Sequence, residues 1–390
     1  MYALAILFVI CLGVLFYTYI GYGVIVGILA TLKKISKTGI HRIDENFLPS
    51  VTLVIPCFNE ATVLADKVEN SLALDYPKSK LHILFITDGS TDGSELFLKK
   101  HKGIEVLHNQ ERRGKAAAEN RAIAHVKSDF VVFCDANTFL NADAIKHLMK
   151  HFADEKVGAV SGEKRVAISA NSVSASGEGL YWKYESWLKK QDSSLHTLAG
   201  AAGELIAFRK SCFLPLEEDT ILDDFVATMR IAINGYKVVY EPLAYASEMA
   251  SASVEEELKR KIRIAAGTWQ ALFRLPKALN PLHDALLTFI YFSHKVMRWV
   301  FSPLALVLLF PIGMILHNAI GGWFTLLWIM QLMFYFFASL GKVLEIKNIN
   351  LKLFYMPYYF IATNYCMIMG FIRFVRGKQS VNWEKAIRAQ

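Results

Sequence analysis

Cysteine is scarce in this 390-residue sequence, and it occurs in no metal-binding spacing. The five cysteines lie far apart, and no two of them form a C-x-x-C pair. A disulfide framework and a cysteine zinc site are therefore excluded, and the cysteines are interpreted as small buried apolar residues. The sequence also contains no internal repeat and no low-complexity tract, which excludes repeat architectures.

Charged residues are few as well. They make up 20% of the chain against 54% apolar residues, and the mean hydropathy is +0.30. This composition excludes a disordered chain and a purely soluble one. The net charge of +8 fits nucleic acid, a membrane surface or an anionic small substrate as partner. Because the basic residues lie beside apolar segments and in loops, and form no single stripe interleaved with aromatic residues, nucleic-acid binding is excluded.

Residues 3–30 contain no charged residue and form the first long apolar segment. A helix of this length crosses ~30 Å of hydrocarbon. No positive charge precedes the segment, which argues against a secretory signal peptide. The basic residues that follow place the N-terminus outside and the next segment in the cytoplasm. They are Lys33, Lys34, Lys37 and Arg42.

Three further apolar blocks lie near the C-terminus, at residues 299–316, 323–340 and 353–372. Segment 285–298 before them is aromatic but carries His, Lys and Arg residues, so we expect it to lie at the membrane interface. Three spans after a cytoplasmic domain would place the C-terminus outside, whereas the basic tail favours the cytoplasm. We therefore expect either that block 353–372 is interfacial or re-entrant, or that segment 285–298 spans after all.

Between these membrane regions, short β-branched runs alternate with helical spacing. The runs at 51–56, 81–86 and 130–134 predict buried parallel strands. The helices are predicted over residues 61–74, 94–100 and 115–126. This order predicts an α/β, Rossmann-like domain with its ligand-binding loops at the carboxyl ends of the strands.

The predicted domains follow from these segments. They are an N-terminal transmembrane helix (1–32), a cytoplasmic domain (33–280), an interfacial helix with the C-terminal transmembrane region (281–375) and a basic tail (376–390).

Polar and acidic residues follow the predicted strands. Asn59 and Glu60 come after the first strand, Asp88-Gly-Ser-Thr-Asp92 after the second, and Asp135-Ala-Asn137 after the third. Each group alone is also typical of a turn or a helix N-cap. The D-x-N spacing fits a hard divalent cation. Arg112-Arg-Gly-Lys115 at a helix start suits a diphosphate, and a solvated basic loop is the alternative.

Four motifs together resemble the family 2 inverting glycosyltransferases, which have a GT-A fold. In chain order they are Val54-Ile-Pro-Cys-Phe-Asn-Glu60, Thr87-Asp-Gly-Ser-Thr-Asp92, Gly114-Lys-Ala-Ala-Ala-Glu-Asn120 and Phe133-Cys-Asp-Ala-Asn-Thr138. Three more resemble the acceptor-side motifs of the membrane-bound processive branch, which includes hyaluronan, chitin, cellulose and poly-N-acetylglucosamine synthases. These are Tyr181-Trp-Lys-Tyr-Glu185, Gly200-Ala-Ala-Gly203 and Leu222-Asp-Asp-Phe225.

The resemblance covers roughly residues 51–270. It implies a GT-A domain on the cytoplasmic side of a multi-pass protein, in a bacterial-type inner or plasma membrane, with one N-terminal and about three C-terminal transmembrane helices.

On the donor side, the resemblance implies a UDP-sugar together with Mg²⁺ or Mn²⁺. Asn59, Glu60 and Asp88 would hold the uridine and ribose, and Lys115 would lie close to the diphosphate. The D-x-N pattern would bind the metal, with asparagine in place of the family's second aspartate. Its residues are Asp135, which would also contact the nucleotide, and Asn137.

On the acceptor side, Asp224 matches the acid of the family's T-E-D motif, the general base that deprotonates the acceptor hydroxyl. The alternative is that this acid only favours the start of a helix. Arg263 matches the arginine of the family's Q-x-x-R-W motif and would bind phosphate, but the glutamine and tryptophan of the motif are missing. An aromatic cluster is either a sugar-stacking surface or a set of packing residues. It comprises Trp182, Tyr184 and Trp187.

These observations favour a membrane-embedded glycosyltransferase that transfers a sugar from a UDP-sugar to a growing polysaccharide or glycan. Single-sugar transfer to a lipid-linked acceptor is the alternative within the enzyme class. A non-catalytic, nucleotide-sensing transport component is the alternative from another class, although the apolar blocks hold few of the polar residues that transport requires. The expected partners are the sugar donor, the glycan or lipid-linked acceptor and membrane lipid. Because three C-terminal blocks are few for an export channel, a second copy of the chain or an export partner would complete it.

Overall fold

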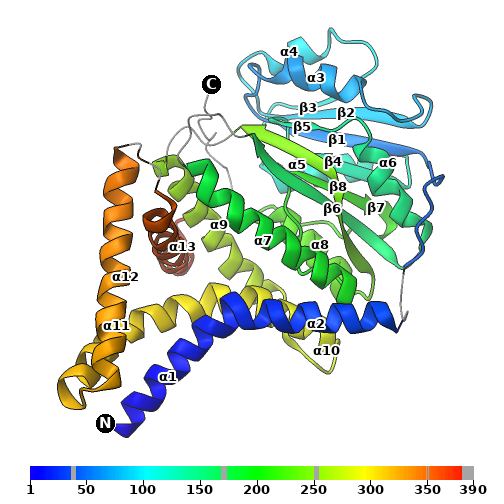
Figure 1. The fold of residues 1–390 in the computed structure, drawn as a ribbon. Helices are drawn as coiled ribbons and strands as arrows, with labels where there is room; N and C mark the ends of the chain where they lie inside the picture. Colours follow the sequence, from blue (N-terminus) through cyan, green and yellow to red (C-terminus); the bar gives the residue numbers. More distant parts are fainter. Residues whose placement is uncertain (37–40, 168–173, 250–253, 348, 350, 380–390) are drawn as a thin grey trace.

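The computed structural model describes residues 1–36, 41–167, 174–249, 254–347, 349 and 351–379. It has two parts (Figure 1). One is a β-sheet with short helices, and the other is a group of long helices from both ends of the chain. Helices α7 (Ser174–Leu195) and α9 (Val254–Arg274) lie between these parts.

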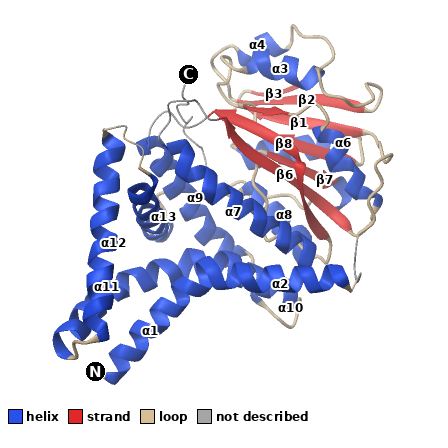
Figure 2. Ribbon diagram, viewed as in Figure 1, coloured by secondary structure: helices blue, strands red, loops and turns tan. Residues whose placement is uncertain are grey.

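The described strands form one eight-stranded sheet in the order β3-β2-β1-β4-β7-β6-β8-β5 (Figure 2). They are β1 (Val51–Cys57), β2 (Leu81–Asp88), β3 (Glu105–Asn109), β4 (Phe130–Cys134), β5 (Thr138–Leu140), β6 (Val157–Ala167), β7 (Leu205–Arg209) and β8 (Lys237–Met249). The first four strands are parallel, whereas β7 is antiparallel to both of its neighbours and β5 is antiparallel to β8. The predicted α/β class is therefore confirmed, with an added antiparallel part.

The parallel half matches the predicted elements closely. Strand β1 is buried at all seven positions, because the sheet is covered on both faces. Its alternate residues enter two different apolar clusters, Val54 on one face and Leu53 and Ile55 on the other. The three predicted helices of this half are also present. They are α3 (Leu64–Leu72), α4 (Ser94–Leu98) and α5 (Lys115–His125).

The remaining helices belong to the second half of the domain and to the two ends of the chain. In the domain they are α6 (Ala144–Met149) and α8 (Asp223–Ile233). At the ends they are α1 (Tyr2–Phe16), η1 (Tyr17–Gly21), α2 (Tyr22–Ile35), α10 (Ala285–Ile290), η5 (Tyr291–Phe301), α11 (Ser302–Ala319), α12 (Trp323–Ile346) and α13 (Lys352–Val375).

Three helices in the described residues are long and apolar enough to cross a membrane: Tyr2–Ile35, Ala285–Ala319 and Trp323–Ile346. The predicted interfacial segment 285–298 and the predicted block 299–316 are thus one continuous helix of 35 residues. Pro303 does not interrupt it, because it lies at the start of α11, where the π-helical bonding of η5 changes to α-helical bonding. Helix α13 covers the predicted block 353–372 but is not one of the three. It runs across α12, since Figure 1 shows α13 almost along its axis and α12 from the side.

A buried charged cluster joins this helical part to the domain. On α7, Glu185 accepts hydrogen bonds from Lys295 (2.8 Å) and Arg298 (2.7 Å) of η5. Asp192, also on α7, bonds His294 of η5 at 2.5 Å. Burial alone would raise the pKa of Glu185, but the cations of η5 outweigh this and hold it well below its usual value. We refer to these five residues as the junction cluster.

Candidate active site

The polar residues that follow the parallel strands gather at one edge of the sheet, as predicted. Lys115, at the start of α5, lies between acids from two different elements. Its Nζ is 2.8 Å from Asp135 Oδ1, just beyond β4, and 3.4 Å from Asp223 Oδ2, at the start of α8. Burial would lower the pKa of Lys115, but Asp135, Asp223 and Glu119 raise it well above its usual value, so the amine is charged.

The carboxylate of Asp88 holds the loop before α5 in place. Its Oδ2 accepts hydrogen bonds from the backbone N–H groups of Arg113 (2.9 Å) and Gly114 (2.7 Å). Its Oδ1 accepts a hydrogen bond from Arg121 (3.1 Å). The loop before α5 is therefore fastened to the end of β2. Gly89 completes this arrangement, because its φ is +68° and a Cβ there would lie 2.7 Å from the backbone nitrogen of Arg112.

Asn59 and Glu60 lie half-buried after β1, beside the same loop end. The Asn59 side-chain oxygen accepts a hydrogen bond from the backbone N–H of Thr91 (2.8 Å), and the Asn59 backbone N–H donates to Ser90 Oγ (3.2 Å). Its φ of 54° is in the left-handed region, which asparagine tolerates better than most residues. The ends of β1 and β2 are thus joined at the position predicted for the nucleoside.

The other cations of the predicted diphosphate loop have different contacts. The Arg112 guanidinium lies 3.6 Å from the ring centroid of Phe58, and the exposed Arg113 forms an ion pair with Glu218. Of the cations in this loop, Lys115 is therefore the one that faces the carboxylates at 135 and 223.

Asp224 lies in the first turn of α8, next to the predicted glycine-rich motif. A Cβ on Gly203 would lie 3.0 Å from Asp224 Oδ2, and a Cβ on Gly200, whose φ is +81°, would lie 2.0 Å from the Phe225 ring. Only glycine lets this loop approach Asp224 and Phe225 so closely. Burial and the adjacent carboxylate of Asp223 raise the pKa of Asp224 to about 7, although Lys115 opposes this.

Glu119, one turn along α5 from Lys115, is a site residue that the sequence reasoning missed. It is only 4% exposed. Burial and the charge of Asp223 raise its pKa well above the usual value, and Lys115 opposes this change. It is part of the motif Gly114-Lys-Ala-Ala-Ala-Glu-Asn120, so its position in that motif was the available signal.

A second missed group lies behind the glycine-rich loop. Lys164 of β6 is buried and donates to Glu204 (2.5 Å), the residue after Gly203, and pairs also with Glu248 of β8. Burial would raise the pKa of Glu204, but Lys164 and Arg260 lower it to about 2. These residues come from separate segments, and no sequence motif indicates that they meet.

Arg263 of α9, predicted to bind phosphate, lies within electrostatic reach of acids on two other segments. Burial lowers its pKa, and the charges of Asp223, Asp224 and Asp135 oppose that change.

The aromatic cluster divides between two places. Trp182 lies near the buried Lys164, whose Nζ is 5.7 Å from the centroid of the Trp182 ring. Tyr184 and Trp187 instead pack on α2, against Gly23 and Gly27. These two residues therefore have the packing role that was the alternative to sugar stacking.

A divalent metal at this edge of the sheet would need ligands from a substrate in addition to those of the protein. In the described part of the chain, no three His, Cys, Asp or Glu side chains converge to hold an ion by themselves. The buried Oδ2 of Asp223 lies 3.4 Å from Lys115 Nζ as an ion pair. Asp135 and Asn137, between β4 and β5, are half-buried. Oxygen donors of this kind suit Mg²⁺ or Mn²⁺, with substrate phosphates supplying the remaining ligands.

The sheet order and the acids at its edge are those of a GT-A-like α/β domain. Residues 52–214 match the family model described as Glycosyl transferase family 2. The chain therefore contains a glycosyltransferase family 2 domain, which confirms the resemblance noted in the sequence.

Curated relatives and a solved structure agree with this assignment. The chain is 32% identical over 244 residues to the poly-beta-1,6-N-acetyl-D-glucosamine synthase of Staphylococcus aureus strain COL, which is 60% of this chain and 57% of that protein. It is 23% identical over 249 residues to the synthase of the same name from Staphylococcus epidermidis strain ATCC 35984, covering 62% and 60%. The chain thus spans less than two thirds of the length of these relatives.

The fold is similar to that of the mannosyltransferase PcManGT from Pyrobaculum calidifontis, solved with GDP-Man and Mn²⁺. The TM-score is 0.70 at 21% identity, over 95% of this chain and 99% of that one. The likeness extends over the long helices as well as the sheet.

Proposed function

We propose that this protein is a membrane-embedded, inverting glycosyltransferase that extends a polysaccharide from a UDP-sugar. The observation that carries the proposal is Asp224, a half-buried acid whose pKa is raised to about 7 by burial and by Asp223. A base with this pKa is about half deprotonated near neutral pH, which is where general-base catalysis is efficient.

In the proposed reaction, the Asp224 carboxylate removes the proton from an acceptor hydroxyl while that oxygen attacks the anomeric carbon of the donor. The bond from this carbon to the diphosphate breaks on the opposite face, so the configuration inverts. Lys115 and Arg263 stabilise the negative charge that develops on the leaving diphosphate. When bound, Mg²⁺ or Mn²⁺ would neutralise the same diphosphate, with Asp135 and Asn137 as its protein ligands.

The nucleoside would lie where the ends of β1 and β2 meet. Asn59 and Glu60 would contact the uridine directly, and Asp88 would support it through the loop that it fastens. The names of the Staphylococcus relatives favour N-acetylglucosamine as the transferred sugar, so UDP-N-acetylglucosamine is the first donor to test.

The proposed topology places the domain in the cytoplasm, with Tyr2–Ile35 as the first span. Two spans after the domain, Ala285–Ala319 and Trp323–Ile346, return the chain to the cytoplasmic side. Helix α13 would then lie at the interface, against α9, and the basic tail would stay inside, as the positive-inside rule favours. The proposed boundaries remain 1–32, 33–280, 281–375 and 376–390, and a second copy or an export partner would complete a path for the polymer.

The decisive experiment uses the full chain in nanodiscs and measures nucleoside-diphosphate release. The donors are UDP-N-acetylglucosamine, UDP-glucose, UDP-galactose and GDP-mannose, each with Mn²⁺, Mg²⁺ or a chelator. We expect metal-dependent release from a UDP-sugar, its loss in Asp224→Asn, and no change in Asp66→Asn, the same substitution at an exposed site on α3. Release that persists in Asp224→Asn would reject the assignment of the base.

The products separate the remaining alternatives. Mass spectrometry of the acceptor distinguishes a long polymer from the addition of one sugar. Release from GDP-mannose only would reject the UDP donor. No release from any donor, with glycan and lipid-linked acceptors supplied, would favour the non-catalytic alternative.

A further inference from the structure

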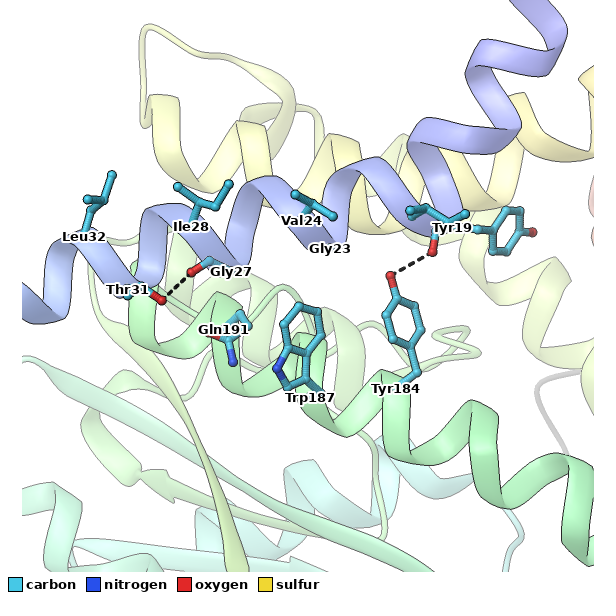
Figure 3. Close-up of a pocket in the computed structure, with 11 residues that line it drawn as sticks. Tyr19, Gly23, Val24, Gly27, Ile28, Thr31, Leu32, Tyr184, Trp187 and Gln191 are labelled. Atoms are coloured by element: carbon cyan, nitrogen blue, oxygen red, sulfur yellow. Dashed lines mark hydrogen bonds between the residues drawn. The ribbon is translucent and has the colours of Figure 1, made fainter.

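A groove of about 700 Å³ lies between α2 and α7 (Figure 3). Its lining comes from these two helices and from η1, and none of its lining residues belongs to the acid cluster at the strand ends. Trp187 and Tyr184 rise from α7 toward α2 in Figure 3, and Gly23 and Gly27 lie above them.

The two glycines create this groove. A Cβ on Gly23 would lie 2.6 Å from the hydroxyl oxygen of Tyr184, and a Cβ on Gly27 would lie 3.3 Å from the Trp187 ring. The rings can therefore lie against the backbone of α2. The Tyr184 hydroxyl also donates to the carbonyl of Tyr19 (2.9 Å), which fixes the ring at one end of the groove.

The wall on the α2 side is an exposed apolar stripe. It consists of residues spaced four apart, which lie on one face of the helix. They are Ile20, Val24, Ile28 and Leu32, each more than half exposed. The stripe is about 18 Å long at 1.5 Å per residue, close to the ~15 Å thickness of one leaflet's hydrocarbon. This length and chemistry match one lipid tail.

The wall on the α7 side combines a ring with positive charge. Trp187 is 40% exposed, and the exposed Lys183 and Lys190 lie four residues before it and three after it, on the same helix face. Lys34 is exposed at the end of α2. Tryptophan and lysine at the end of an apolar surface are typical of the lipid headgroup region.

Negative charge does not offset these lysines on the described exposed surface of the two helices. Helix α2 contains no acidic residue. The acids of α7 whose side chains are described, Glu185 and Asp192, are buried and paired with η5 in the junction cluster. The exposed rim of the groove is therefore positively charged.

We propose that this groove binds an anionic phospholipid, with a tail along the α2 stripe beside Trp187 and the headgroup at Lys183, Lys190 and Lys34. The charge of the rim selects the headgroup, since each lysine near an anionic lipid surface contributes favourably. The proposal rests on the membrane location in the proposed function, and it does not require catalysis.

The test is native mass spectrometry of the full chain released from detergent after incubation with phosphatidylglycerol or phosphatidylcholine of the same tails. We expect wild type to retain phosphatidylglycerol at least five-fold more than phosphatidylcholine. The double variant Lys183→Gln and Lys190→Gln should bring this ratio below two. The matched control changes Lys100→Gln and Lys102→Gln, two exposed lysines of the catalytic domain, and should keep the wild-type ratio.

A second readout uses the groove directly. Phosphatidylglycerol with brominated tails should quench tryptophan fluorescence more in wild type than in Trp187→Phe. Equal retention of both lipids by wild type, an unchanged ratio in the lysine variant, or equal quenching in Trp187→Phe would each overturn the proposal. So would a stable dimer that carries no lipid, because a second copy would then cover the groove. Lipid selectivity without nucleotide release would reject the proposed function alone.

Discussion

The proposed donor side and the proposed acceptor side of the site are stabilised by different kinds of contact. On the donor side, neighbouring strand ends hold each other through backbone groups, as Asp88 does with the loop before α5. On the acceptor side, long side chains of α9 hold the loop that leads to the base. Gln270 accepts from the N–H of Ile221 (3.0 Å) and donates to the carbonyl of Asp219 (2.8 Å), and Arg274 donates to Thr220 (2.9 Å).

A neighbouring face of α9 packs against the C-terminal helix α13. A Cβ on Gly370 would lie 2.4 Å from Ala265, and the rings of Phe273 and Phe374 stack with their centroids 5.6 Å apart. The proposed base is therefore positioned by α9, which also packs against α13, whereas the proposed donor contacts lie within the sheet. Changes on the donor side should affect donor binding, and changes on the acceptor side should affect turnover.

The largest effect is expected for Asp224→Asn. Loss of a general base lowers kcat by about 10²–10⁴-fold. The pH dependence gives a sharper test. Because the pKa of Asp224 is raised to about 7, the basic form is lost as pH falls below 7. In wild type, kcat/KM should therefore fall about tenfold for each pH unit below 7 and be level above it. In the variant this limb should be absent, and a limb that remains would assign the titration to another group.

Lys115→Met should change binding and stability together. The donor KM should rise at least tenfold, because the diphosphate loses its buried cation. Removing one partner of a buried ion pair typically costs about 3–5 kcal/mol, since Asp135 and Asp223 are left without their cation. Because the pKa of the neighbouring Asp224 is raised to about 7, its protonation relieves part of the repulsion among these acids, and the loss of Tm should be larger at pH 8 than at pH 5. Thermal unfolding followed by intrinsic fluorescence measures it, and a pH-independent loss would contradict this reason.

Gln270→Leu tests the acceptor side through a residue that touches no substrate. We expect kcat to fall about tenfold while the donor KM stays within twofold, because the loop before the base loses both of its hydrogen bonds to α9. Gln270→Glu keeps the acceptor for the Ile221 N–H and should recover part of the rate. A shift of the pH limb of kcat/KM would show that the base has moved. An equal change in donor KM would contradict the separation of the two sides.

Arg113→Ala should have the smallest effect. Arg113 and Glu218 form an exposed ion pair that bridges the donor and acceptor loops, with both side chains about half exposed. Such pairs contribute about 0–1 kcal/mol. Steady-state rates within twofold of wild type are expected at 0.15 M salt. A tenfold loss of kcat would mean that the two sides are coupled through this bridge.

The difference between the two sides also explains what the sequence could predict. Strands β1, β2 and β4 are continuous apolar runs, and the polar residues at their ends follow directly in the chain, so both were predictable. Strands β6 and β8 were missed because they contain charged residues such as Lys164 and Glu248, whose ion pairs form only when the fold brings separate segments together. Gln270 was missed for a similar reason, since its partners lie 49 and 51 residues away. The continuous helix Ala285–Ala319 was divided in the prediction, because its charges meet their partners only on α7.

The junction cluster has a mechanical consequence. If the helix Ala285–Ala319 turned or slid along α7, Lys295 and Arg298 would leave Glu185 and enter apolar surroundings, at a cost of several kcal/mol for each unpaired charge. The sheet domain is therefore held rigidly on these helices and does not pivot on a flexible stalk. In the proposed reaction, a growing product would have to move past a stationary base, one sugar at a time.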